Sequence, residues 1–222
     1  GDRLFVVDSN IGWSKVDRNI DRSMTYRVGL SEDGPVKSQL TLGYQNTSEY
    51  GAVGCDFQRT DRGQDYDLLK NACYWNYLRV LLHPSAKLRS ADLFPLPANS
   101  IAVATGRGIA EEDTAAIRQV ASGVSFEGLV TAAPGERINA TISFDLPSSV
   151  VRWNDTTAVY SLELQAQPGM SGRFTRIELA MPEGWRFVSG SIPPLEEAGE
   201  SVVFEIDLMT DQMLVVEMGR SS

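Results

Sequence analysis

The single histidine of the chain limits the catalytic chemistry that its sequence supports. His83 stands directly before Pro84, at the end of an apolar stretch. A metal site with several His ligands and a Cys₂His₂ zinc site are therefore excluded, and a Ser-His-Asp triad would have to use this one residue. No Gly-x-Ser-x-Gly motif presents a nucleophilic serine. The sequence thus nominates no catalytic residues and predicts that the chain is not an enzyme.

Four aspartates lie close together in the region between the two cysteines. They are Asp56, Asp61, Asp65 and Asp67. Carboxylate oxygens at such spacing could bind Ca²⁺, but their order does not match the calcium loop of an EF-hand. Arg59 and Arg62 stand among them and would offset their charge. We therefore expect a solvated loop without a cofactor, with Ca²⁺ binding as the alternative.

The two cysteines, Cys55 and Cys73, bracket this polar loop of 17 residues. Closing a loop of that size with a disulfide stabilises a fold by roughly 3 kcal/mol in the chain-entropy model. Cys55 sits in a Gly- and Asp-rich stretch and not on an apolar stripe. That setting favours a disulfide, and with it an oxidising compartment, over two buried thiols in a cytosolic protein.

Residues 13–22 mix an aromatic ring with charges of both signs, which would suit a docking surface for a sugar or a protein. The candidate docking residues are Trp13, Lys15, Asp17 and Arg22. The alternative is structural, because Val16, Ile20 and Met24 recur every four residues and could pin a short helical turn to the fold. The sequence favours the structural interpretation. Trp153 is a further docking candidate, although packing between the two halves of the chain is the simpler interpretation.

Charge and hydropathy exclude several classes of partner. The chain carries 20 basic and 29 acidic residues, a formal charge of −9. A net acidic surface opposes binding to nucleic acid and to anionic lipid. No apolar run approaches the roughly 20 residues of a membrane span. The given sequence does not open with the basic start, apolar stretch and small-residue cleavage site of a signal peptide, so we expect any export signal to lie upstream. Because the chain begins with Gly, we expect a segment of a longer protein that contacts the membrane only through an upstream anchor.

Alternation of apolar and polar residues with period two dominates the chain and predicts an all-β fold. Residues 24–30 and 36–44 alternate on either side of a Gly-Pro turn, which predicts a hairpin with one buried face. The aromatic-rich stretch of residues 73–83 predicts a central strand. Only residues 65–72 and 111–121 have the composition of short helices.

A weak internal repeat divides the chain into two parts. Residues 79–90 and residues 176–189 each contain a strand, a corner that begins with proline, and another strand. A strand–turn–strand pair follows each unit, over residues 126–144 in the first part. We therefore predict two tandem immunoglobulin-like β-sandwich modules, residues 1–150 and residues 151–222, the smaller packed on the larger.

Two motifs carry a resemblance to a known family. The segment NIGWSKVDR at residues 10–18 and the segment CYWNYLRV at residues 73–80 resemble the C-terminal region of bacterial membrane-anchored envelope proteins of the domain of unknown function 4012 type. The Pro-Gly turn at Pro134 and the Pro-Glu-Gly-Trp corner at residues 182–185 fit the same region, and the corner also resembles immunoglobulin-like surface modules. The resemblance implies a location at the cell surface or in the cell envelope, and it supplies no established activity.

These observations lead to two expectations about function. The first is a non-catalytic, extracytoplasmic structural or protein-interaction segment of a bacterial cell-envelope protein. Its partners would be the upstream domain of the same protein or another envelope protein. The second is a carbohydrate-binding module for cell-wall or exported polysaccharide, which predicts a row of exposed aromatic residues on one sheet face.

Overall fold

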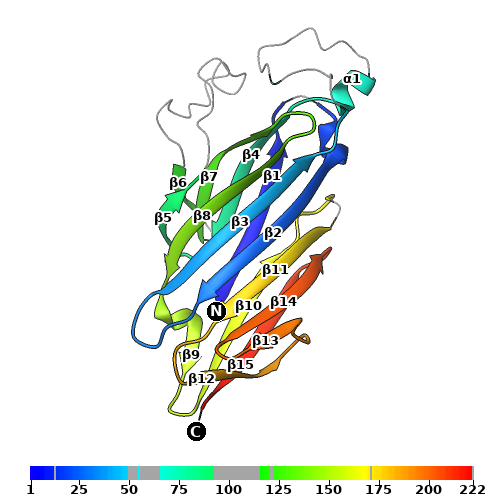
Figure 1. Cartoon of the computed structure of the whole chain (residues 1–222). Coiled ribbons are helices and arrows are strands. Elements are labelled where there is room, and N and C mark those ends of the chain that lie inside the picture. The colour runs from blue at the N-terminus through cyan, green and yellow to red at the C-terminus, as the bar shows by residue number, and fades with distance from the viewer. Residues whose placement is uncertain are drawn as a thin grey trace.

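The fold is all-β, as the alternation predicts. The computed structural model describes residues 1–12, 14–49, 55, 66–92, 116–120 (backbone only), 123–170 and 172–221. Two large sheets pack face to face along the length of the molecule (Figure 1). The short helical elements are η1 (Val16–Asn19), α1 (Tyr66–Lys70) and η2 (Ser148–Val150).

We call the larger sheet, with eight strands, sheet A, and the seven-stranded one sheet B. The order in sheet A is β12 (Trp185–Gly190), β15 (Gln212–Arg220), β10 (Thr157–Gln165), β1 (Asp2–Asn10), β4 (Tyr74–Leu82), β7 (Gly123–Ala132) and β6 (Ala116–Val120), with β9 (Val151–Trp153) paired to β10. The order in sheet B is β13 (Glu196–Ala198), β14 (Ser201–Leu208), β11 (Arg173–Ala180), β2 (Ile20–Gly29), β3 (Val36–Asn46), β8 (Arg137–Leu146) and β5 (Lys87–Ala91).

Burial follows the period-two pattern along most strands, so that every second side chain enters the space between the sheets. The inward-facing residues of both sheets form one large hydrophobic core that extends through both halves of the chain. Its largest fully buried side chains include Trp185, Tyr26, Tyr44, Tyr160 and Phe126. A smaller second cluster gathers Trp75 and Leu129 around Cys73.

Several elements expected from the sequence are present. Strands β2 and β3 pair as the predicted antiparallel hairpin, and β4 lies inside sheet A, between β1 and β7. The predicted helix at residues 65–72 is α1. The helix predicted at residues 111–121 is wrong for residues 116–120, which form β6 and pair antiparallel with β7. Pairing with a neighbouring strand has overridden the helical propensity of this short Ala-containing stretch.

The two proline corners predicted by the repeat carry the chain from one sheet to the other. At the first, the Ala86 amide donates to the His83 carbonyl at 2.9 Å between β4 and β5. At the second, Trp185 donates to the Pro182 carbonyl at 3.1 Å between β11 and β12, and Gly184 takes a φ of +80°, which favours glycine. Residues 126–144 also cross between sheets, because β7 belongs to sheet A and β8 to sheet B.

A similar strand order recurs in the two halves of the chain. In the first half, β3-β8-β5 lie in sheet B and β4-β7-β6 in sheet A. In the second half, the corresponding strands β10-β15-β12 lie in sheet A and β11-β14-β13 in sheet B. The two halves therefore repeat one arrangement of six strands with the two sheets exchanged.

Strands β1 and β2 join the two halves. Strand β1 pairs antiparallel with β4 and parallel with β10, and β2 pairs antiparallel with β3 and parallel with β11. The division into modules at residue 150 stays a prediction. In both sheets, a strand from before that residue pairs directly with a strand from after it. The site described next lies at this junction.

Candidate functional site

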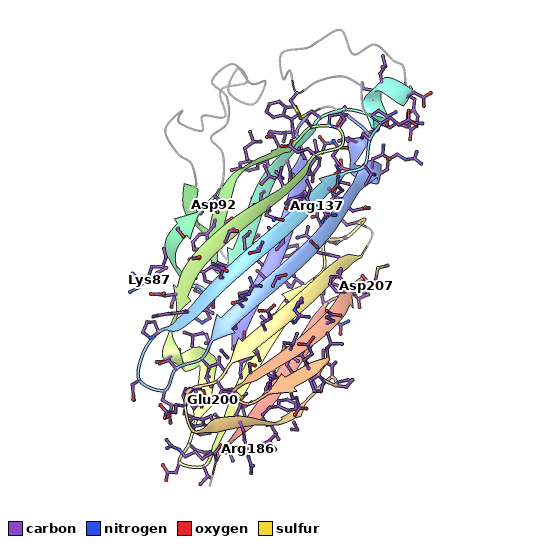
Figure 2. The ribbon with its side chains drawn as sticks, in the orientation of Figure 1. Lys87, Asp92, Arg137, Arg186, Glu200 and Asp207 are labelled. Carbon is purple, nitrogen blue, oxygen red and sulfur yellow. A yellow bond between two sulfur atoms is a disulfide. The ribbon has the colours of Figure 1, made fainter. Side chains whose placement is uncertain are left out.

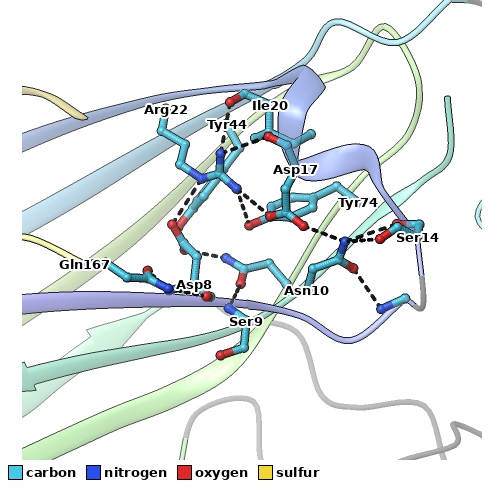
Figure 3. Close-up of polar contacts among 12 residues, drawn as sticks. Asp8, Ser9, Asn10, Ser14, Asp17, Ile20, Arg22, Tyr44, Tyr74 and Gln167 are labelled. Atoms are coloured by element: carbon cyan, nitrogen blue, oxygen red, sulfur yellow. Dashed lines mark hydrogen bonds and ion pairs between the residues drawn. The ribbon is translucent and has the colours of Figure 1, made fainter. Parts of the chain in front are cut away.

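A network of buried charged and polar side chains surrounds Asp8 at the junction of the two halves (Figure 3). Asp8 faces inward because it is in phase with Leu4 and Val6 on β1, and its side chain is fully buried. One carboxylate oxygen accepts hydrogen bonds from the Tyr44 hydroxyl at 2.7 Å and the Asn76 amide at 2.6 Å. The other accepts from two arginines.

Those two arginines come from different halves of the chain. Arg22, on β2, donates from Nε to Asp8 at 3.2 Å, and Arg173, on β11, donates from Nη2. The Gln167 side chain adds a third link, since it accepts from the Asp8 amide at 2.8 Å and donates to the Asp8 carbonyl at 2.9 Å. The Asp8 carboxylate thus links strands of sheet A to strands of sheet B. It also links elements that precede residue 150 to an element that follows it.

Arg22 also organises the turn that leads into β2. Its Nη2 donates to Asp17 at 2.9 Å and to the Tyr74 hydroxyl at 3.0 Å, and its Nη1 donates to the Ile20 carbonyl at 3.0 Å. Asn10 donates to the second Asp17 oxygen at 2.7 Å. Burial lowers the pKa of the Arg22 guanidinium, but its neighbours, Tyr74 and Asp8 first, raise that pKa above its ordinary value overall.

A second buried carboxylate lies at the other end of β1. Asp2 accepts hydrogen bonds from the Tyr26 hydroxyl at 2.7 Å and the Tyr160 hydroxyl at 2.6 Å. Tyr26 belongs to the first half and Tyr160 to the second, so this carboxylate also links the two halves. Burial raises the pKa of Asp2 to about 6, although its hydrogen bonds to the two tyrosines lower it.

The geometry of these two carboxylates does not suit acid–base catalysis. Asp2 and Asp8 are six residues apart on one strand, which corresponds to about 20 Å. Glycoside hydrolysis needs two carboxyl groups roughly 5 to 10 Å apart. Within the described part of the chain, no cluster of three or more His, Cys, Asp or Glu residues could hold a metal ion. These two carboxylates instead hold neighbouring strands together through hydrogen bonds and ion pairs.

The outer face of sheet B carries a shallow hollow of about 600 Å³. Arg27 and Glu178 form an ion pair of 2.8 Å at one side of it, and Arg89 pairs with Asp145 at the other. Lys37 is exposed and lies opposite Asp145 in the strand register. Short and charged side chains cover this face, which also carries Lys87, Arg137 and Asp207 (Figure 2). The hollow, rimmed by these ion pairs, is therefore a candidate contact surface.

The structure separates the docking residues predicted from the sequence. Trp13 lies outside the described residues, and Lys15 is exposed, with its amide bonded to the Leu69 carbonyl at 2.9 Å. Asp17 and Arg22 belong to the Asp8 network, where the Arg22 side chain is only 4% exposed. Trp153 is half-buried and packs edge-to-face on Trp185, with ring centroids 5.0 Å apart. Arg22 and Trp153 therefore make their main contacts within the molecule.

The predicted disulfide is confirmed, with Cys55 bonded to Cys73 at the start of β4. Of the four aspartates considered for Ca²⁺, Asp67 pairs with Lys70 at 2.6 Å, and Asp56, Asp61 and Asp65 lie outside the described residues. His83 is half-buried at its corner and accepts a hydrogen bond from the Ser85 amide at 3.1 Å. Burial lowers its pKa below the ordinary value. None of the helices in the described ranges could cross a bilayer.

Comparison with known proteins gives structural likenesses alone. No family model and no curated protein sequence matches the chain. A protein described as nutrient-binding, from Legionella pneumophila, superposes with a TM-score of 0.47 and 8% identity over 97% of this chain and 71% of that one. Leukotriene A4 hydrolase from Saccharomyces cerevisiae gives 0.44 and 9% over 94% of this chain and 31% of that one.

A third likeness is of the same kind. An M1 zinc metallopeptidase from Deinococcus radiodurans gives a TM-score of 0.36 and 8% identity, over 90% of this chain and 42% of that one. The chain thus spans less than half the length of either enzyme. All three TM-scores lie below 0.5, so these likenesses carry nothing about the function of this chain.

Proposed function

We propose that this chain is a non-catalytic, extracytoplasmic segment of a bacterial cell-envelope protein, with a structural or protein-interaction role. The observation that carries the proposal is the junction at β1 and β2, where both sheets continue from one half into the other. Two buried carboxylates on β1 then bond to both halves. An elongated body fixed in this way suits a rigid spacer that holds an upstream domain at a set distance.

Two further features support the location. The resemblance to the C-terminal region of membrane-anchored envelope proteins implies an extracytoplasmic segment, and the Cys55–Cys73 disulfide suits an oxidising compartment. The net charge of −9 opposes binding to nucleic acid. On the fold, we propose that the repeated six-strand arrangement represents two immunoglobulin-like modules that have merged through β1 and β2.

A distance measurement between spin labels tests the rigid-spacer role. Labels at the exposed residues Glu136, between β7 and β8, and Glu183, between β11 and β12, report its length. Those two connections lie at opposite ends of the molecule (Figure 1). One narrow distance distribution is expected, because no flexible hinge separates two bodies that share both sheets. A broad distribution would refute the rigid spacer. Labels at Glu136 and Arg27, both in the first half, give the matched control for the flexibility of the label itself.

The alternative function, carbohydrate binding, predicts a row of exposed aromatic residues. Among the described residues, the aromatic side chains that are about half exposed are Tyr66 on α1 and Phe174 on β11, which lie on separate elements. A pelleting assay against insoluble bacterial cell wall and exopolysaccharide separates the two functions. We expect no saturable binding, and saturable binding lost in Tyr66→Ala, Phe174→Ala or Trp13→Ala would establish the carbohydrate-binding alternative.

A further inference from the structure

The connection between β2 and β3 contains the dipeptide Asp33-Gly34, which occurs once in the sequence. When glycine follows aspartate, the glycine amide nitrogen can attack the carboxyl carbon of the aspartate side chain. Glycine favours this attack because it has no side chain to obstruct the approach and its backbone is permissive. Whether the reaction takes place in the folded protein depends on the exposure of the carboxyl group and on the hydrogen bonds of the amide.

Both reacting groups are open in the structure. Asp33 is exposed, and residues 32–34 form bends that belong to no strand. Within the described part of the chain, the Asp33 carboxyl group makes no hydrogen bond or ion pair, and the Gly34 amide makes no hydrogen bond. The side chain and the following amide are therefore free to approach each other.

Asp155 provides a contrast within the same molecule. It is also exposed and also stands in a turn, before β10. The amide that follows it, of Thr156, donates a hydrogen bond to Asn154 Oδ1 at 3.2 Å. This bond holds the Thr156 amide in place, and the Thr156 side chain restricts its approach. Asp33 therefore combines exposure, a free amide and a glycine successor, whereas Asp155 has exposure alone.

We propose that Asp33 is a modification site, at which the chain isomerises spontaneously to isoaspartate. The Gly34 nitrogen bonds to the side-chain carbonyl carbon of Asp33, and the amide proton and the carboxyl hydroxyl leave as water, so that a succinimide ring forms. Water then adds at either ring carbonyl and breaks one of the two carbon–nitrogen bonds. Opening at the main-chain carbonyl routes the chain through the former side chain, and the composition of the protein is unchanged.

The site lies beside a contact between the two halves of the chain. Glu32, directly before Asp33, accepts a hydrogen bond from Arg220 Nη2 at 2.7 Å. The Arg220 guanidinium also lies over the Trp185 ring, 5.1 Å from its centroid. An isoaspartyl link adds one methylene group to the main chain. The modification therefore lengthens the β2–β3 connection at the point where it meets β15 of the second half.

Peptide mapping of the purified protein after incubation at neutral pH tests the proposal. Trypsin releases residues 28–37 as one peptide that contains Asp33, and electron-transfer fragmentation distinguishes isoaspartate from aspartate. We expect isoaspartate to accumulate at Asp33 at a rate within a few-fold of that in the free synthetic peptide, and none to accumulate at Asp155 over the same time. A rate in the folded protein at least an order of magnitude below that of the free peptide would overturn the proposal, because the fold would then protect the site.

Two substitutions of glycine assign the reaction to the Gly34 amide. A Cβ at residue 34 would meet only the Ser31 hydroxyl, at 3.3 Å, so Gly34→Ala should fold and should slow isomerisation several-fold. Gly29→Ala is the matched control, since its Cβ would lie 3.7 Å from the Lys37 carbonyl, and it should leave the rate unchanged. Asp33→Glu, which would need a six-membered ring, should give no product. Equal rates in the two glycine variants would contradict the assignment.

Discussion

At the scale of single residues, Asp8 is the acid on which most of the junction depends. Replacing it by asparagine keeps the shape of the side chain but leaves Arg22 and Arg173 buried without their shared counter-charge. Removing one partner of a buried ion pair commonly destabilises by 3–5 kcal/mol. We therefore expect Asp8→Asn to lower the free energy of unfolding by roughly that amount in urea denaturation.

The matched control for this variant is Asp17→Asn. Asp17 binds the same Arg22 guanidinium, but its side chain is 40% exposed, and exposed ion pairs contribute about 1 kcal/mol or less. A loss from Asp17→Asn as large as that from Asp8→Asn would mean that burial does not distinguish the two acids.

Asp2 makes the stability of the fold depend on pH. Its folded pKa of about 6 exceeds the ordinary value of 3.8, so the folded state binds more protons than the unfolded state between these two values. The contribution of this group to stability should therefore be fully present below about pH 4 and be lost as the pH rises to 6, by about 3 kcal/mol. Asp2→Asn should remove this decrease, and Asp21→Asn, at an exposed position, should retain it. Urea denaturation at pH 4, 5, 6 and 7 measures the slopes.

The alternation of residues along the strands already indicated that these charged side chains face inward, although charged residues are usually expected at the surface. Asp2 and Asp8 are in phase with Leu4 and Val6, and Arg22 is in phase with Met24 on a strand whose apolar face was predicted. Period-two phase alone places all three side chains toward the core. Their partners could not be predicted, because Arg173 meets Asp8 only through the parallel pairing of distant strands.

At the scale of elements, prediction succeeded where contacts are local. The β2–β3 hairpin depends on one turn, and the two proline corners depend on their own residues. Strand β1 was missed because Leu4, Phe5, Val6 and Val7 are all apolar and hide the alternation. Residues 126–144 were predicted as a strand–turn–strand pair, and a local pattern cannot tell whether the two strands join one sheet or two.

The disulfide is an element-scale constraint with a measurable contribution. It closes the loop that contains α1 onto the buried start of β4. A loop of this length predicts about 3 kcal/mol of stabilisation. The double variant Cys55→Ser and Cys73→Ser should therefore lose about 3 kcal/mol of the free energy of unfolding, measured by urea denaturation. Alkylation of the unfolded, unreduced protein should add no label, and two labels would show that the purified protein lacks the bond.

At the scale of the whole molecule, the fold joins two copies of a strand arrangement into one body. The shared strands place each half's core in contact with the other's, and the buried residues of both form one hydrophobic core. A chain of two independent modules would instead have two cores and two unfolding transitions. We therefore expect the two halves to unfold as a single cooperative unit.

Removing a core aromatic from one half tests this cooperativity. Phe204 on β14 and Phe144 on β8 are both fully buried, in the second and first halves respectively. Phe204→Ala should lower the free energy of unfolding by about 3–5 kcal/mol. Pulsed hydrogen exchange at increasing urea concentrations gives an unfolding midpoint for peptides from each strand. The midpoints of peptides from β3 and from β14 should decrease together. Phe144→Ala should do the same from the other side. If Phe204→Ala shifts β14 and leaves β3 unchanged, the halves unfold separately and the junction does not couple them.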